Sequence, residues 1–361
     1  MGNKFKNVMA LSLLPQIVLI KWLGSHPDWV EHYYSTGFYP WFSRLFRSLL
    51  GWIPFSIGDI IYVTLIMLGI RYIYTRRRRI RSAPLLFLRD VAMVLSIAYL
   101  TFHLSWGMNY YRLPLAQKLG IGQEYSKQDL LDLTHSLIEH TNGLQYTITG
   151  DTVSKVHIDL SQPELFDQVV RDYQSLGKRI PILNYEKRSV KTSLISTLLT
   201  YMGYAGYLNP FTHEAQVNAL LPHFRFPVVV GHEIGHQLGY AAEREANMIG
   251  YLVTQGSGNP QLQYAASAYA LGYCLVDIRG YDPSLFNSLY AKVNKGVQRN
   301  YGEMDRFWSS YENPMEPLFK SLYSNFLKAN DQADGILGYN AVVGLLVNYH
   351  KKYPPKDVKK M

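Results

Sequence analysis

The sequence predicts a mainly α-helical membrane protein, in which three N-terminal transmembrane helices precede a mostly helical domain with a small β-sheet. Three observations predict this fold class: three long apolar stretches in the first third, an excess of positive charge in that same third, and helical periodicity over most of the rest. The 361 residues are 48% apolar and only 17% charged, which argues against disorder. The single cysteine, Cys274, excludes an intramolecular disulfide framework.

The apolar stretches lie within residues 1–112, which we interpret as the transmembrane region. They run over residues 8–24, 57–74 and 85–106. A spanning helix needs roughly 20 mostly apolar residues, and each stretch reaches that length by including a polar residue or two near an end, where long side chains can extend to the interface. Tyr and Trp flank the stretches, as is typical of membrane boundaries. The lipid bilayer is therefore an expected partner.

The charge distribution agrees with this interpretation and predicts a topology. Residues 1–112 hold 13 Lys/Arg and 4 Asp/Glu, whereas residues 113–361 hold 23 of each sign. The excess centres on an arginine cluster, Arg76 to Arg79 with Arg71 and Arg81. A basic cluster between two apolar stretches, without interleaved aromatic residues, indicates a cytoplasmic loop, so no nucleic-acid partner is expected. The N-terminus is then inside, and the large domain is extracytoplasmic.

Two features of this region leave alternatives open. The first apolar stretch has a basic start and a short apolar core, so it could be a cleaved signal peptide, although no Ala-x-Ala-like site follows. Residues 25–54 are rich in Trp, Phe and Tyr. They are expected to form either an amphipathic helix in the outer interface of the membrane or a cap packed on the later domain.

Residues 113–361 are predicted to be mainly helical. Ser126 and Ser161 each precede an amphipathic pattern, and Glu164 stands where a capping box with Ser161 would place it. Residues 150–160 and 188–196 show β-branched alternation typical of short strands, and part of 206–221 is also strand-like. After residue 260, helical patterns cover residues 261–279, 283–298, 303–328 and 338–350.

One motif indicates chemistry. Residues 232–236 read His-Glu-Ile-Gly-His, an HExxH motif that follows an apolar run. On a helix, His232 and His236 lie on one face about one turn apart, so both imidazoles can bind one Zn²⁺. Glu233 would then stand beside the zinc-bound water as its general base. The sequence therefore predicts Zn²⁺ as the cofactor and Glu233 as the catalytic residue.

Catalytic zinc usually has a third protein ligand, and two glutamates are candidates. Gly239 stands where a helix can end, and a second helical pattern containing Glu243 and Glu245 follows. On one uninterrupted helix Glu243 would lie about 10 Å beyond His236 along the axis, so a turn at Gly239 is required. Either carboxylate would complete a His₂Glu ligand set.

The residues Glu243-x-x-x-Asn247 resemble the Glu-x-x-x-Asp element of gluzincin metallopeptidases. That resemblance implies Glu243 as the third zinc ligand, with Glu245 as the alternative, and Asn247 as the residue that orients a histidine from behind. Asn replaces the usual Asp, so the hydrogen bond would lack its charge. Metzincins would have a histidine near position 242, where this chain has Ala242.

Over most of its length the chain also resembles an uncharacterised family of bacterial membrane proteins with N-terminal spans and an HExxH domain. Three blocks carry this resemblance: residues 109–112, residues 209–212 with Glu214, and the run from the HExxH motif to Asn247. This resemblance implies a location in the bacterial inner membrane, with several spans, but no activity. The HExxH motif and the gluzincin-like element together predict that residues 113–361 form a zincin-like metallopeptidase domain.

Fewer signals identify the residues that would contact a substrate. The segment at 210–218 is expected to be either a strand lining the cleft or an ordinary structural strand. Within it, His213 and Glu214 are either substrate contacts or parts of a capped turn. A residue that stabilises the oxyanion is expected as well. Tyr240, Tyr269 and Arg279 are the candidates.

These observations predict a membrane-anchored zinc metallopeptidase, in which Glu233 assists the attack of a zinc-bound water on a peptide bond. Its partners would be the bilayer and a peptide or protein substrate. The alternative from another class is a membrane-tethered, non-catalytic binding or regulatory protein with a vestigial HExxH site. A third possibility is zinc-dependent hydrolysis of a non-peptide component of the cell envelope.

Overall fold

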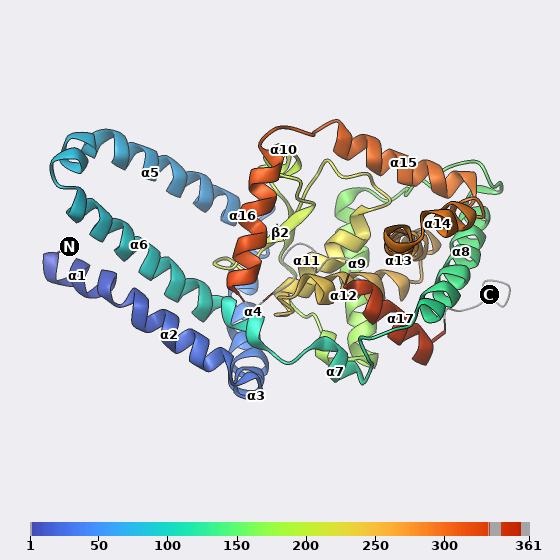
Figure 1. The fold of residues 1–361 in the computed structure, drawn as a ribbon, viewed down its shortest axis with the longest axis horizontal. Coiled ribbons are helices and arrows are strands. Elements are labelled where there is room, and N and C mark those ends of the chain that lie inside the picture. The colour runs from blue at the N-terminus through green and yellow to red at the C-terminus, as the bar shows by residue number, and fades with distance from the viewer. Residues whose placement is uncertain (1, 331, 333–340, 355–361) are drawn as a thin grey trace.

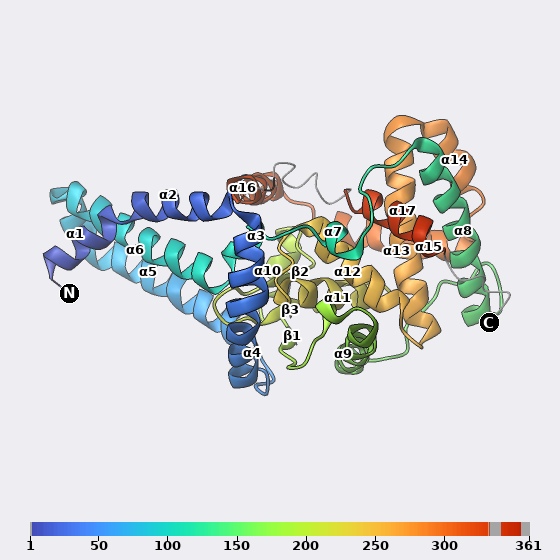
Figure 2. The ribbon, with the colours of Figure 1, turned by 90° about the horizontal axis from the view of Figure 1, so that it is seen from below.

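The computed structural model describes residues 2–330, 332 and 341–354. Apolar helices extend from one end of a mainly helical body that contains a three-stranded sheet (Figures 1 and 2). The mainly α fold class with a small β-sheet is thus confirmed. Among the described residues, three helical stretches are long and apolar enough to cross a membrane: 3–24, 57–82 and 84–105.

The first apolar stretch forms two helices, α1 (Asn3–Leu11) and α2 (Leu13–Gly24), separated by Ser12. The Ser12 hydroxyl donates to the Met9 carbonyl and lies 3.1 Å from the Ser96 hydroxyl of α6 (Pro84–Ser105). The helix begins at residue 3, not at residue 8 as predicted. The apolar run shows which residues are compatible with the interior of a membrane, but it does not set the start of the helix. Lysine is a good helix former, so the helix also includes the lysines that precede the run.

The arginine cluster does not form the predicted loop. Helix α5 (Ile57–Ser82) continues through all of these arginines, and only Ala83 separates it from α6. Arginine is a strong helix former, and its side chain is solvated at a helix end, so the helix outlasts its apolar part. The cluster and the N-terminus lie at the same end of the molecule, far from the helical body (Figure 1).

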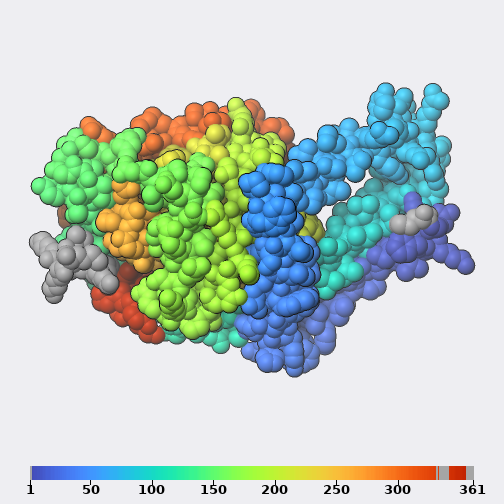
Figure 3. Space-filling view, turned by 180° about the vertical axis from the view of Figure 1, so that it is seen from behind, coloured from blue at the N-terminus to red at the C-terminus, as the bar shows by residue number. Residues whose placement is uncertain are grey.

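Residues 25–56 pack against the helical body as a short connecting segment. Its elements are α3 (Pro27–Trp29), the π-helix η1 (Val30–Phe38) and α4 (Tyr39–Leu50). Helix α4 buries one row of side chains, which consists of Tyr39, Ser43 and Arg47. It exposes another row, which consists of Trp41, Leu45 and Leu49. Figure 3 shows α4 lying against the body, so it caps the domain and keeps an exposed apolar row.

The N-terminus of α5 is anchored inside the body. The backbone N–H groups of Ile57 and Gly58 donate to the Glu214 carboxylate, at 3.2 and 2.6 Å. Glu214 also forms a buried ion pair with Lys191. A carboxylate at a helix N-terminus satisfies free N–H groups and interacts favourably with the helix dipole. This contact fixes where the second apolar helix leaves the body.

After α6 the chain enters the body through the 3₁₀ helix η2 (Gly107–Tyr111) and α7 (Leu115–Leu119). Two long helices follow, α8 (Lys127–Thr149) and α9 (Gln162–Arg179), and the short 3₁₀ helix η3 (Pro181–Leu183) comes next. Both long helices begin with a capping box, formed by Ser126 with Asp129 and by Ser161 with Glu164. The predicted starts of these helices are therefore confirmed.

The sheet has the strand order β1-β3-β2. Its strands are β1 (Val190–Thr192), β2 (Gly206–Leu208) and β3 (Ala215–Val217), and α10 (Ser196–Tyr201) lies between the first two along the chain. β3 pairs with β1 in parallel and with β2 antiparallel. The strand predicted at 150–160 is wrong. Its backbone hydrogen bonds go to side chains instead, since Asp151 accepts from the N–H groups of Val153 and Ser154.

The C-terminal part of the chain is helical, but the bounds of its helices differ from those that the sequence patterns predict. They are α13 (Pro260–Tyr281), α14 (Pro283–Tyr290), α15 (Lys295–Ser309), α16 (Glu316–Ala329) and α17 (Val342–Lys352). The predicted continuous helices at 283–298 and 303–328 are each interrupted. Pro314 and Pro317 explain the second break, because proline removes a backbone donor and favours the first turn of a helix. The start predicted at residue 338 lies outside the described residues.

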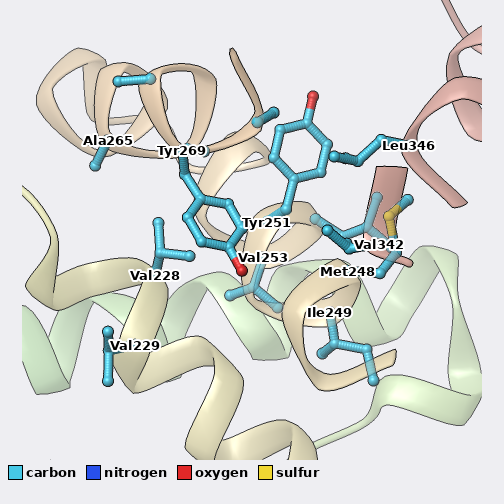
Figure 4. Close-up of a cluster of buried hydrophobic side chains, with 14 of the residues drawn as sticks. Val228, Val229, Met248, Ile249, Tyr251, Val253, Ala265, Tyr269, Val342 and Leu346 are labelled. Atoms are coloured by element: carbon cyan, nitrogen blue, oxygen red, sulfur yellow. The ribbon is translucent and has the colours of Figure 1, made fainter. Parts of the chain in front are cut away.

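The largest apolar core includes buried side chains of α8, α9, α11 (Phe226–Gln237), α12 (Glu243–Gln255), α13 and α17. Figure 4 shows Val228 of α11, Met248 and Tyr251 of α12, and Leu346 of α17 within it. Burial of these apolar side chains holds α11 against α12. Because α11 carries the HExxH motif, this core also positions the candidate site.

Candidate metal centre

Helix α11 presents the HExxH motif in a regular α-helical turn. Pro227 occupies its first turn, where proline is favoured. The imidazole rings of His232 and His236 are 4.6 Å apart at their centroids and nearly perpendicular, at 89°. Potential ligand atoms of these two residues and of Glu233 all lie within 4.8 Å of one another. The spacing of the motif thus brings three chemically active side chains to one end of the helix.

The chain turns back after α11 at Gly239, as predicted. Gly239 has a φ of +85°, a left-handed conformation that glycine adopts without strain. Helix α12 then packs closely on α11 where Gly231 faces Gly250: a Cβ atom added to Gly231 would lie 2.9 Å from the Gly250 Cα. This close crossing brings the first turn of α12 over the two histidines.

The carboxylate of Glu243 meets both imidazoles. Its Oε2 atom lies 3.3 Å from His232 Nε2 and 3.8 Å from His236 Nε2. Oε2 is buried and has no hydrogen-bond partner among the described residues, while Oε1 accepts a hydrogen bond from the Tyr323 hydroxyl. Two imidazole nitrogens and one carboxylate oxygen therefore converge on a shared point, which is the donor set of a His₂Glu zinc site.

The other nitrogen of each imidazole is held from behind. His232 Nδ1 donates to Asn247 Oδ1 at 2.8 Å, and His236 Nδ1 donates to the Tyr240 carbonyl at 2.7 Å. These bonds leave the Nε2 lone pairs directed toward Glu243. Such contacts fix the tautomer and the ring orientation of metal-binding histidines. Asn247 thus makes the hydrogen bond that its place in the sequence predicts.

The electrostatics of the cluster favour a positive charge between the converging atoms. Burial raises the pKa of Glu243, but the two histidines outweigh it and hold that pKa well below its ordinary value. Burial lowers the pKa of His236, but the contact with Glu243 outweighs it and raises this pKa to about 9. Both pKa shifts have the same cause: the carboxylate and the imidazole nitrogens face one another, and a positive charge between them stabilises all of these atoms.

Glu233 has a different environment from Glu243. Burial raises its pKa to about 7 and outweighs the opposing effect of His232 and His236. Its Oε2 atom is buried without a hydrogen-bond partner among the described residues. A carboxyl group with a pKa near neutrality can both accept and return a proton. The pKa and position of Glu233 therefore suit a general base.

Glu245, the alternative ligand, faces away from the histidines. Its carboxylate accepts a hydrogen bond from the Leu115 N–H at 2.7 Å. It lies among the charges of Arg112 and Lys118, and burial raises its pKa. Glu243 and Glu245 are two residues apart on one helix, so they point about 200° apart around its axis. Only the first can face α11.

A cavity of about 590 Å³ opens beside the cluster and contains His232, Glu233, His236 and Glu243 in its wall. Most of the remaining wall is aromatic or aliphatic. Tyr62 of α5 and Phe102 of α6 also line it, so two of the apolar helices reach the cavity. The residues Gly206, Tyr207 and Leu208 of β2 form another part of the wall.

The strand at the cleft differs from the predicted one. Segment 210–218 contains β3, the central strand, which is paired on both sides. The cavity is lined instead by the edge strand β2, together with Pro210 and Phe211 at the start of the segment. His213 and Glu214 do not line the cavity. The His213 ring packs against Tyr39, Phe42 and Phe46, and Glu214 anchors α5. The capped-turn interpretation of these two residues is the one that the structure supports.

Only one of the proposed oxyanion-stabilising residues lies at the cavity. Tyr269 lines it, with the Arg225 guanidinium 3.8 Å from its ring centroid. The Tyr240 ring lies under Arg112, and Arg279 lies over Phe286, away from the cavity wall. Nothing in the sequence distinguishes Tyr269 among 29 tyrosines.

Sequence analysis missed two residues that touch the site. Tyr323 of α16 donates to Glu243, and the Trp106 indole N–H donates to the His236 carbonyl at 2.9 Å. Each is about 80 or more positions from its partner along the chain. No local spacing signals a contact of this kind. An alignment of related sequences would be the signal able to find it.

Comparison with known proteins identifies a family but no function. No curated protein and no solved structure matches the chain. One family model does match, over residues 34–347, and its description is "Protein of unknown function (DUF3810)". The matched region runs from η1 to α17 and includes all residues of the candidate metal centre. The chain therefore belongs to the DUF3810 family.

Proposed function

We propose that this protein is a membrane-anchored zinc metallopeptidase whose catalytic domain lies outside the cytoplasm. The observation that carries the proposal is the convergence of His232 Nε2, His236 Nε2 and Glu243 Oε2, with both Nδ1 atoms engaged elsewhere. Catalytic zinc sites typically have three protein ligands and one open position. This ligand count, beside an open cavity, favours an enzyme over a closed structural zinc site.

The residues present fit a zinc ion. Glu233 and Glu243 each keep a buried carboxylate oxygen without a hydrogen-bond donor among the described residues. Such oxygens are costly to bury unless a cation or a proton compensates them. His232, His236 and Glu243 would hold the metal, and Asn247 would keep His232 oriented. When bound, Zn²⁺ would polarise the substrate carbonyl and make water nucleophilic at neutral pH.

Glu233 would carry the proton through the reaction. It would accept a proton from the attacking water and later return that proton to the leaving amine, as a carboxyl group with a pKa of about 7 can do near neutral pH. Tyr269 and Arg225 line the same cavity and are candidates for stabilising the developing oxyanion. Each of these roles belongs to a residue that faces the cavity.

The edge strand favours an extended peptide as the substrate. Tyr207 faces Gln216 of β3, with backbone hydrogen bonds on either side from Asn209 N–H to Glu214 and from Asn218 N–H to Ala205. This alternation directs the backbone groups of Gly206 and Leu208 away from β3. An extended peptide can add to such an edge. A Cβ at Gly206 would lie 2.6 Å from Glu233 Oε1, so the strand runs close beside the proposed base.

The charge distribution along the apolar helices supports the proposed topology. Lys4, Lys6 and the arginine cluster lie at the end remote from the helical body. Positive charge is enriched on the cytoplasmic side of membrane helices. If the three helices span the bacterial inner membrane, the body and its cavity lie on the other, extracytoplasmic side.

Metal analysis of the detergent-purified protein tests this proposal first. The wild type should bind one zinc ion per chain, and His232→Ala and Glu243→Ala should lose it. Glu245→Gln is the matched control, because this carboxylate is buried in the same helix but faces α7, and it should retain the metal. Absence of zinc from the wild type after reconstitution would instead favour a non-catalytic binding or regulatory protein.

Glu233→Gln separates metal binding from catalysis. We expect this variant to keep its zinc and to lose about 10²- to 10⁴-fold in peptide hydrolysis, the usual contribution of a general base. The measurement is cleavage of a quenched fluorescent peptide library by the protein in detergent. Full activity of the Glu233→Gln variant would show that the proposed role of Glu233 is wrong. If the protein bound zinc but hydrolysed only a non-peptide component of the cell envelope, it would be a zinc hydrolase and not a peptidase.

A further inference from the structure

Helix α16 supplies one wall of the metal cavity, yet most of the helix is exposed. Tyr323 reaches Glu243, and Lys320, Tyr323 and Phe326 line the cavity. Leu327 is the one side chain of α16 that is fully buried. A helix held by so few inward contacts still leaves the greater part of its circumference free for another partner.

The exposed circumference of α16 divides into an apolar and a polar side. Leu318, Leu322 and Phe326 follow one another at intervals of four residues, Met315 precedes them by three, and they are 40–58% exposed. Such spacing places them in one row along the helix. Ser321, Asn325 and Lys328 are also exposed and form a neighbouring row. One exposed row is therefore apolar, and the row beside it is hydrophilic.

The apolar row of α16 continues toward the apolar helices. The Phe326 ring is 5.8 Å from the Phe102 ring of α6, and Lys21 of α2 donates to the Ala329 carbonyl at 3.0 Å. Phe102 is in the last turn of the third apolar helix. The end of α16 thus rests where two candidate spans meet the helical body.

The direction of α16 suits a membrane surface. In Figure 1 the helix runs across the direction of α6, and it lies at the level where the apolar helices join the body. If those helices cross the bilayer, a helix that runs across them at this level lies along the surface of the membrane. Helix α4, with its own exposed row of Trp41, Leu45 and Leu49, also runs across the long axis at this level (Figure 2).

We propose that α16 lies on the outer surface of the bilayer, with Met315, Leu318, Leu322 and Phe326 in the lipid. Amphipathic helices of this kind bury their apolar face at the boundary between head groups and acyl chains. The occupant of the apolar row is therefore lipid, and the wall of the metal cavity formed by α16 faces the membrane. This inference rests on the membrane part of the proposed function and is independent of the zinc chemistry.

Site-directed spin labelling in phosphatidylcholine nanodiscs tests this. A nitroxide at Leu322→Cys is compared with one at Ser321→Cys, because these adjacent exposed positions point about 100° apart. The collision rates with oxygen, which partitions into lipid, and with a water-soluble nickel complex are measured. Ile66→Cys in α5 is the lipid reference, and Ser284→Cys at the start of α14 is the aqueous reference. The wild type serves as the labelling blank, because Cys274 is buried.

The expected result is a ratio of oxygen to nickel collisions at Leu322 that approaches the Ile66 value and is several-fold above the Ser321 value. A Leu322 label as accessible to nickel as the Ser284 label would overturn the inference. A Leu322 label shielded from both agents would also overturn it, in favour of a protein partner such as a second copy. If the Ile66 label were also as accessible to nickel as an aqueous site, the membrane part of the proposed function would be wrong. The Ile66 label therefore distinguishes a failure of the proposed function from a failure of the inference about α16 alone.

Discussion

Both oxygens of Glu214 have hydrogen-bond donors at the junction between α5 and the sheet, whereas Glu233 and Glu243 in the candidate metal centre each keep one buried oxygen without a donor among the described residues. Lys191 supplies the charge that Glu214 needs, and its ammonium group also donates to the carbonyls of Leu50 and Phe55. The negative charge of Glu214 is thus compensated by a residue of the chain. The unpaired oxygens of Glu233 and Glu243 can be compensated by a proton or a cation. Buried acidic groups can thus be structural or functional, and their hydrogen bonds distinguish the two.

Unpaired atoms alone do not identify a site, as His213 shows. Both of its ring nitrogens are buried without hydrogen-bond partners among the described residues, and the ring packs against the aromatic rings of Tyr39, Phe42 and Phe46. Burial among aromatic rings keeps the imidazole neutral and lowers its pKa to about 3. The candidate metal centre differs because its unpaired atoms lie close to the other potential ligand atoms of the cluster. Convergence, in addition to the missing hydrogen bonds, is what indicates a ligand.

The largest effect in this comparison is expected from Lys191→Met, which removes the cation from Glu214. Breaking a buried ion pair leaves an uncompensated charge, so we expect a loss of about 3–5 kcal/mol in the free energy of unfolding. Chemical denaturation of the detergent-solubilised protein measures it. The matched control is Arg44→Met, whose ion pair with Glu186 is about half exposed and should contribute less than about 1 kcal/mol. Equal losses in both variants would contradict the structural role of the buried pair.

A smaller effect is expected when the support behind His232 is removed. Asn247→Ala deletes the acceptor for His232 Nδ1, and loss of such a contact typically lowers metal affinity by about 10- to 100-fold. Competition with a chelator of known zinc affinity measures the change. Asn247→Asp restores an acceptor and adds charge, so it should bind zinc at least as tightly as the wild type. Unchanged affinity in Asn247→Ala would mean that His232 needs no such support.

The smallest effect concerns pH and the buried neutral histidine. The pKa of His213 is about 3 in the folded protein and about 6.5 in the unfolded chain, so only the unfolded state gains this proton between those values. Stability from this group is complete above about pH 6.5 and is lost as the pH falls, by about 1.4 kcal/mol at pH 5.5. Urea unfolding of the wild type and of His213→Asn at pH 7.5 and 5.5 measures it. Asn tolerates the positive φ of this position, and the variant should show a smaller loss on acidification.

Elements defined by local patterns were predictable from the sequence. The caps at Ser126 and Ser161, the turn at Gly239 and the spacing of the HExxH motif all depend on residues a few positions apart, and the structure has each of them. The strand predicted at 150–160 failed because β-branched alternation does not say whether a partner strand exists. That segment hydrogen-bonds to side chains, including Asn300 of α15, instead.

The chemical character of the site was contained in the order of residues, because two histidines and a glutamate within five positions of one helix need no distant contact to meet. The packing of α12 on α11 through Gly231 and Gly250 determines that Glu243, and not Glu245, faces the two histidines. Tertiary packing also placed Tyr323 on Glu243, brought β2 to the cavity and set α16 across the apolar helices. These arrangements join residues far apart in the chain, and their energies come from surfaces that exist only when the helices pack together.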